Sequence, residues 1–309
     1  MTDNNSTAMR PAITTACAVL FIYLCSSCTQ LTNKDFFVSV DDYKIYVEET
    51  GKGDPIILLH GGLLDHRMWK EQVDDLSKSF RVITVDMPGH GRTINGDSTI
   101  MFNRVLLKIM DTLKIDKASL LGLSLGGVAV TDFAISYPDK CDKVILAAPG
   151  LVGWDFKQDS VLAKQDEDRN KTLLAKDTLG FVESFVQSWT DGPQRTPDKV
   201  NSEVRDSVKH WVYENIKRHQ LRHWPGFTEN PPASEVLDSI KSPVLIIVGN
   251  IDMKDIVMIT SLMESKFPDV RKITFDGVAH MVNLENPIQF NEEVKNFLIS
   301  KRKTDVQTE

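Results

Sequence analysis

The stretch Gly122-Leu123-Ser124-Leu125-Gly126 decides how this sequence folds, because it places a serine between a predicted strand and a predicted helix. The mostly apolar residues 118–121 before it are typical of a buried strand, and the small and apolar residues 127–134 after it are typical of a helix. A glycine on each side of the serine permits a turn that is too tight for a side chain. Such a turn lifts the serine hydroxyl out of the sheet beside the start of a helix, and this position suits a nucleophile.

The carboxyl-terminal half supplies the partners that a nucleophilic serine needs. A serine hydroxyl is a weak nucleophile at neutral pH, so it requires a histidine base and an acid that orients the base. Residues 242–249 predict a buried parallel strand with Asp252 just past its end, and residues 271–275 predict a further strand whose following loop ends at His280. Functional groups of open α/β sheets collect at the carboxyl ends of strands, so we expect these groups to meet the serine. Asp255 is the alternative acid, because it lies three residues further along.

These motifs, together with two others, resemble those of the α/β-hydrolase fold superfamily, in its esterase, lactonase and haloperoxidase-like branch. The stretches that carry the resemblance are His60-Gly61-Gly62, Asp86-Met87-Pro88-Gly89-His90-Gly91-Arg92, the serine turn, Gly249-Asn250-Ile251-Asp252 and His280-Met281-Val282-Asn283-Leu284-Glu285-Asn286-Pro287. The resemblance extends from about residue 36 to residue 300. The sequence departs from the superfamily at Ala279, where Gly is common, and at Thr93, where Ser is common, and neither departure changes the three reacting groups.

The resemblance implies an α/β fold with a mostly parallel, doubly wound sheet and an inserted helical cap. It also implies an oxyanion hole of two backbone N–H groups, for which we expect Gly62 and Leu125, with Leu63 as the alternative to Gly62. The expected activity is that of a serine hydrolase that cleaves a carboxylic ester or lactone through an acyl-enzyme formed on Ser124, without a cofactor. The alternatives are a carbon–carbon bond hydrolase, a perhydrolase, and a ligand-binding or receptor protein that retains the same three residues.

The amino-terminal segment resembles a bacterial lipoprotein signal. Arg10 precedes an apolar run over residues 12–24, which is short for a membrane span and long enough for a signal-peptide core. Ser26-Ser27 before Cys28 resembles a lipoprotein cleavage box, so we expect Cys28 to carry lipid and to anchor the protein in the cell envelope, at the outer membrane or the periplasmic face. The alternatives are an ordinary secretory signal that yields a soluble secreted or periplasmic enzyme, an uncleaved anchor, and a start at Met9 rather than at the first residue.

The sequence is expected to divide into a signal, a core that is interrupted by a cap, and a short tail. The expected bounds are a signal peptide at residues 1–27, a tether at 28–35, the hydrolase core at 36–150 and 233–300, a helical cap at 151–232 and a tail at 301–309. A cap is expected because the alternation of strands and helices stops at Pro149-Gly150 and resumes at Pro243, with helical segments at 178–190 and 201–222 between them. Seven aromatic residues are expected on its inner face, two or three of them toward the substrate: Trp154, Phe181, Phe185, Trp189, Trp211, Trp224 and Phe227.

Composition and histidine spacing limit the partners. The net charge of −7 argues against binding to nucleic acid. His219 and His223 are four residues apart, as zinc ligands on one helix face would be, but no further ligand is evident, so we expect no metal. Asp86, His60 and His90 are interpreted as turn and packing residues. The expected partners are a small apolar ester or lactone and a membrane reached through the lipid anchor, and the sequence does not determine the oligomeric state.

Overall fold

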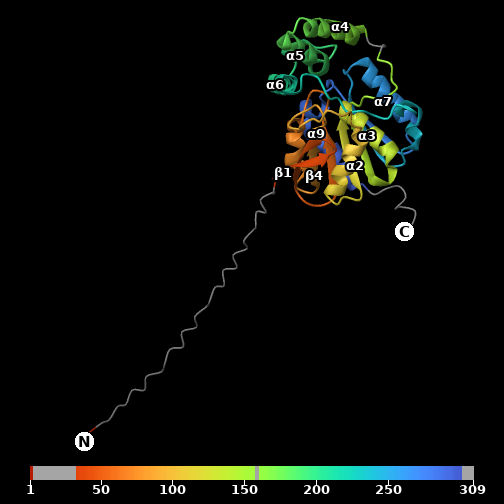
Figure 1. Cartoon of the computed structure of the whole chain (residues 1–309). Coiled ribbons are helices and arrows are strands. Elements are labelled where there is room, and N and C mark those ends of the chain that lie inside the picture. Colours follow the sequence, from red (N-terminus) through yellow and green to blue (C-terminus); the bar gives the residue numbers. More distant parts are fainter. Residues whose placement is uncertain (3–32, 157–159, 301–309) are drawn as a thin grey trace. The chain divides into compact units, whose positions relative to one another are not determined.

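The computed structural model describes residues 1–2, 33–156 and 160–300 (Figure 1). The predicted signal, the expected lipid attachment at Cys28 and the tail at residues 301–309 lie outside this described part. By its internal contacts the chain divides into a short unit, Met1–Gln30, and a large unit, Leu31–Glu309, and every element named below belongs to the large unit. In the described ranges, no helix combines the length and apolar character that crossing a membrane requires.

The large unit is built on a sheet of eight strands in the order β1-β2-β4-β3-β5-β6-β7-β8. The strands are β1 Asn33–Val40, β2 Tyr43–Thr50, β3 Pro55–Leu59, β4 Arg81–Val85, β5 Ala118–Leu123, β6 Cys141–Ala147, β7 Val244–Gly249 and β8 Val270–Phe275. Strand β2 pairs antiparallel with both of its neighbours, and the remaining pairs are parallel. The predicted mostly parallel sheet is therefore confirmed, and its parallel strands read as apolar runs because helices cover both faces.

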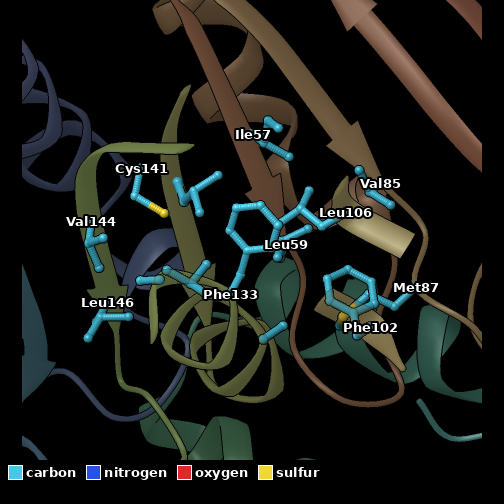
Figure 2. Packing of buried hydrophobic residues seen from close by; sticks show 14 of the residues in the cluster. Ile57, Leu59, Val85, Met87, Phe102, Leu106, Phe133, Cys141, Val144 and Leu146 are labelled. Carbon is cyan, nitrogen blue, oxygen red and sulfur yellow. The ribbon is translucent and has the colours of Figure 1, made fainter. Parts of the chain in front are cut away.

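Helices cover both faces of this sheet. The helices that pack on the sheet are α1 Lys70–Leu76, α2 Phe102–Thr112, α3 Leu125–Ser136, α7 Lys254–Lys266, α8 Val282–Glu285 and α9 Pro287–Ile299. The insertion contributes α4 Ser160–Leu174, α5 Thr178–Val186 and α6 Ser202–His219. Successive strand residues point to opposite faces. Ile57 of β3 packs in the layer that contains α2, α3 and α7, whereas its neighbour Ile56 packs in the layer that contains α1 and α9. Figure 2 shows Phe133 of α3 beside Leu59 of β3, in the first of these layers.

The predicted helical insertion lies between β6 and β7, and α4, α5 and α6 gather at one end of the large unit (Figure 1). The expected helix at 178–190 corresponds to α5 and a π-helical turn, Gln187–Asp191, and the expected helix at 201–222 corresponds to α6. Helix α6 begins where it does because the side chain of Asn201 accepts a hydrogen bond from the backbone N–H of Glu203 at 2.9 Å. Helix α4 has no counterpart among the expected segments, because its charged sequence carries little helical periodicity.

Candidate active site

Ser124 occupies the sharp turn between β5 and α3. Its backbone has φ 55° and ψ −112°, a conformation that non-glycine residues seldom adopt and that is often found at functional sites. The flanking glycines make this turn possible: a Cβ on Gly122 would lie 2.1 Å from the carbonyl oxygen of Gly126, and a Cβ on Gly126 would lie 2.0 Å from that of Leu59. The serine therefore stands at the amino-terminal end of α3, where backbone N–H groups favour developing negative charge.

His280 lies in the loop after β8, and its imidazole contacts Asp252 in the loop after β7. The Nδ1 atom of His280 lies 2.9 Å from Oδ2 and 3.2 Å from Oδ1 of Asp252, and both residues are buried. The Nε2 atom of His280 is buried too and has no hydrogen-bond partner within the described part of the chain. The alternative acid, Asp255, is directed elsewhere and accepts a hydrogen bond from the indole N–H of Trp154 at 2.9 Å. Asp252 is thus the acid that contacts the histidine.

Two cavities meet at Ser124. The His280 cavity has a volume of about 330 Å³, and its lining includes Ser124, His280 and Trp189. The Ile256 cavity has a volume of about 470 Å³, and its lining includes Ser124, Trp189 and Ile256. Apolar side chains dominate both linings, so the serine hydroxyl lies where two apolar compartments join. Such an arrangement fits an ester, because the acyl and alcohol parts of an ester extend in different directions from the reacting carbon.

Most of the cap's aromatic residues line these two cavities. Five of the seven do so, more than the expected two or three: Phe181, Phe185, Trp189, Trp224 and Phe227. Of the other two, Trp154 bonds to Asp255, and Trp211 packs against a buried apolar cluster. The aromatic surface of the cap therefore faces the serine to a larger extent than the sequence indicates.

A partly buried ion pair joins the cap to α8, beside the loop that carries His280. The guanidinium of Arg195 donates to Oε2 of Glu285 at 2.6 Å and to the backbone oxygen of Thr190 at 2.8 Å. The other carboxylate oxygen of Glu285 accepts the backbone N–H of Ala279 at 3.0 Å. Because Ala279 precedes His280 and Thr190 follows Trp189, this pair holds the tryptophan and the histidine in one arrangement.

The expected oxyanion donors border the His280 cavity. Gly62, Leu63 and Leu125 all line it. Leu125 is the first residue of α3, so its backbone N–H belongs to the first turn, where N–H groups have no partner inside the helix. Leu63 has φ 60°, which shows that the chain turns sharply just after Gly62.

Hydrogen bonds from the loop after β4 hold the loop that follows β3. The Nε2 atom of His60 accepts the backbone N–H of Met87 at 3.0 Å, and burial lowers the pKa of this imidazole. The carboxylate of Asp86 accepts the backbone N–H of His66 at 2.8 Å and that of Arg92 at 2.7 Å. These contacts agree with the interpretation of His60 and Asp86 as turn and packing residues.

Two groups of residues in the described part of the chain contain side chains of the kind that bind metals. Possible ligand atoms of Asp65, His66 and Asp86 lie within 4.8 Å of one another. However, Arg67 donates to both oxygens of Asp65 at 2.8 Å, and His66 bonds to Asp86, so the group forms a hydrogen-bond network. Although burial opposes it, the pairing with Arg67 lowers the pKa of Asp65 to about 2.

His219 and His223 do not share a helix face. Helix α6 ends at His219, and His223 follows with a φ of 63°. The Nε2 atom of His219 lies 3.0 Å from the carbonyl oxygen of Gly91, so this ring joins α6 to the loop after β4. The spacing of four residues therefore does not create a pair of ligands here.

Sequence reasoning missed some residues that line the His280 cavity. Arg169 and Leu173 reach it from α4, Leu221 reaches it from the segment after α6, and Met281 follows the histidine directly. The adjacency of Met281 to His280 was a usable signal. The side chains from α4 gave none, because only the packing of the cap brings this charged helix to the serine.

A strained serine turn under a helical cap, on this sheet order, defines a hydrolase of the α/β class. The family model described as alpha/beta hydrolase fold matches residues 54–287, and the chain belongs to that family. An uncharacterized carboxylesterase of Bacillus subtilis is 25% identical over 272 residues, covering 85% of this chain and 86% of that protein. A pimeloyl-[acyl-carrier protein] methyl ester esterase of Nitrosomonas europaea is 28% identical over 261 residues, covering 80% of this chain and 96% of that protein.

A solved structure shares the fold. The crystal structure of a carboxylesterase from Bacillus subtilis superimposes with a TM-score of 0.71 at 22% identity, covering 88% of this chain and 93% of that chain. The protein is therefore an α/β-hydrolase related to carboxylesterases and other hydrolases, and its predicted fold class is confirmed.

Proposed function

We propose that this protein is a serine hydrolase that cleaves a carboxylic ester or lactone, with Ser124 as nucleophile, His280 as base and Asp252 as the acid that orients the base. One observation carries the proposal. The imidazole of His280 is bonded through Nδ1 to a buried carboxylate, while its Nε2 is buried and has no partner among the described residues; both His280 and Ser124 line the same cavity. A histidine arranged in this way is poised to accept a proton from a hydroxyl in that cavity.

The chemistry follows in two halves. Nε2 of His280 takes the proton of the Ser124 hydroxyl as the serine oxygen attacks the ester carbonyl, and it then gives that proton to the departing alcohol. A water molecule repeats the sequence on the acyl-enzyme: it loses a proton to His280, attacks the acyl carbon and releases the acid as the serine regains its proton. Asp252 accepts the Nδ1–H throughout, so it fixes the tautomer and stabilises the transient imidazolium.

The backbone N–H groups of Gly62 and Leu125 are proposed to bind the oxyanion. Both residues border the His280 cavity. Each well-placed donor in such a site contributes on the order of 3 kcal/mol of transition-state stabilisation. Leu63 is the alternative to Gly62 as the first donor, because it borders the same cavity.

An ester or lactone with apolar parts is the substrate class that the two cavities favour. The names of the carboxylesterase and methyl ester esterase relatives point to ester hydrolysis as well. Carbon–carbon bond hydrolysis and perhydrolysis would use the same three side chains, so a panel of nitrophenyl esters and lactones beside a vinylogous diketone separates the activities.

Labelling with a fluorophosphonate probe tests the proposed nucleophile without knowledge of the substrate. The wild-type protein should label rapidly, and Ser124→Ala and His280→Ala should not. Rapid labelling of folded Ser124→Ala protein would assign the reactive hydroxyl to another residue, and a wild-type protein that does not label would favour a binding role for this fold.

We also propose that the protein is anchored in the cell envelope by lipid on Cys28. The support is the apolar run over residues 12–24 and the Ser26-Ser27-Cys28 stretch that follows it. A diacylglyceryl group together with an amide-linked chain would hold the protein firmly, since two lipid chains already give stable anchoring. Mass spectrometry of the mature amino terminus decides this: lipid on Cys28 supports the anchor, and a plain terminus leaves a secreted enzyme.

A further inference from the structure

A positively charged side chain lines the His280 cavity. Arg169 of α4 lines it, and among its lining residues Arg169 is the one aspartate, glutamate, lysine or arginine. The side chain of Arg169 is only 11% exposed, and burial lowers the pKa of its guanidinium. Placing a cation among apolar side chains costs free energy unless an anion or a set of acceptors compensates.

The partners of Arg169 leave room for a ligand. One terminal nitrogen, Nη1, donates to the hydroxyl of Ser188 at 3.1 Å, and the other, Nη2, pairs with the carboxylate of Asp166. These two bonds engage two of the five N–H groups of the guanidinium. Asp166 is half exposed and lines the Ile256 cavity rather than the His280 cavity. The compensating anion thus lies outside the compartment that the guanidinium lines.

We propose that Arg169 binds a carboxylate carried by the acyl part of the substrate, so the preferred substrate is a half-ester of a dicarboxylic acid. The ester carbonyl lies at Ser124, the chain crosses the apolar wall that includes Phe181 and Phe185, and the free carboxylate meets the guanidinium. A planar guanidinium suits this ligand, because its parallel N–H groups match the two carboxylate oxygens. This inference rests on the proposed ester hydrolysis and names its substrate class.

The test compares two matched series of methyl esters. One series contains the monomethyl esters of dicarboxylic acids from succinate to sebacate, and the other contains methyl esters of monocarboxylic acids with the same numbers of carbons. For at least one chain length, the wild-type kcat/KM should be about ten-fold or more higher for the half-ester, the discrimination expected from one charge-assisted contact. Arg169→Gln should remove most of this ratio, and Arg169→Lys, which keeps the charge but loses the planar fork, should keep part of it.

Lys164→Gln is the matched control, because Lys164 lies on the same helix, its side chain is 78% exposed and its loss also removes one positive charge. It should leave the ratio unchanged. A wild-type ratio near one at every chain length overturns the inference. An equal loss of kcat/KM for both series in a folded Arg169→Gln protein overturns it as well, because Arg169 would then have only a structural role through its pair with Asp166.

A binding measurement separates this inference from the proposed function. If neither series is hydrolysed and the fluorophosphonate probe does not label the protein, the proposed function fails. Calorimetry with monomethyl adipate and monomethyl suberate on the Ser124→Ala protein then tests the arginine alone. Tighter binding of these half-esters than of their neutral counterparts, lost in the Ser124→Ala, Arg169→Gln protein, supports the carboxylate site, and equal binding overturns it.

Discussion

The ring centroids of Trp189 and His280 lie 4.6 Å apart, and the two ring planes are inclined at 50°. Trp189 comes from the π-helical turn of the cap, and His280 comes from a loop at the carboxyl end of the sheet. The contact therefore joins the insertion to the proposed base, and Trp189 also lines both of the cavities that meet at Ser124. Four predictions follow from this site and from the core beneath it.

Substitution of the proposed triad should abolish ester hydrolysis. Ser124→Ala and His280→Ala should each leave almost no turnover, and Asp252→Asn should cost less, around 10⁴-fold, by analogy with serine proteases. Asp255→Asn is the matched control, because an asparagine oxygen can still accept the bond from Trp154. Initial rates on a nitrophenyl ester, with folding checked by circular dichroism, measure the effect. A loss of activity in Asp255→Asn equal to that in Asp252→Asn would show that the assignment of Asp252 as the orienting acid is wrong.

Trp189→Ala should enlarge both cavities that the indole lines and free one face of His280. We expect kcat/KM for short esters to fall by roughly ten-fold, because a misplaced base lowers the rate without being removed. Esters with bulky alcohols should lose less, since removal of the indole leaves more room beside Ser124. Trp189→Phe keeps an aromatic ring beside the imidazole and serves as the control. If Trp189→Ala and wild-type protein show the same ranking of substrates, the tryptophan does not shape the site.

Stability should fall as the solution becomes acidic, and His90 should contribute to the loss. Burial lowers the pKa of His90 to about 3, from 6.5 for a free histidine. Between these values the unfolded chain binds a proton that the folded chain refuses, so this contribution to stability decreases as pH falls from 6.5 toward 3. For His90 alone, the loss is roughly 2–3 kcal/mol between pH 6.5 and pH 4.5.

Urea unfolding of wild-type and His90→Asn protein at several pH values measures this contribution. An asparagine N–H can replace the Nδ1 atom that lies 2.9 Å from the carbonyl oxygen of Pro88, and it carries no titrating group. The variant should therefore show a shallower decline than wild type. Identical slopes would mean that His90 does not titrate between the folded and unfolded states.

Cys141 should resist thiol reagents in the folded protein. Burial raises the pKa of this thiol to about 12, so thiolate is scarce at neutral pH. A chain that starts at Thr29 contains Cys141 as its single cysteine, which makes the assay unambiguous. Iodoacetamide should react with it only after denaturation. The Cys141 thiol lies against the carbonyl oxygen of Tyr137. Rapid modification of the native chain would therefore show that the segment from Tyr137 to Cys141 opens readily.

The sequence predicted the sheet and the proposed triad better than it predicted which cap residues line the cavities. Glycines, strand ends and chain order are local features, so the serine turn and the sheet followed from them, and the Asp252–His280 hydrogen bond is a contact that this sheet edge permits. The positions of Trp189 and Arg169 depend on how three cap helices pack. The aromatic composition of the cap therefore predicted Trp189 only as one of seven candidates, and the charged sequence of α4, which has little apolar period, gave no indication of Arg169.

The order of the strands has a consequence for self-association. Strands β1 and β8 form the two edges of the sheet, and each edge exposes unpaired backbone groups that another strand can join. Both edges carry charge: Lys34 and Asp35 are exposed on β1, and on β8 Arg271 pairs with Glu293 near the surface. Adding a foreign strand would strip water from these ions. The chain therefore contains its own protection against edge-to-edge aggregation, at positions remote from the serine.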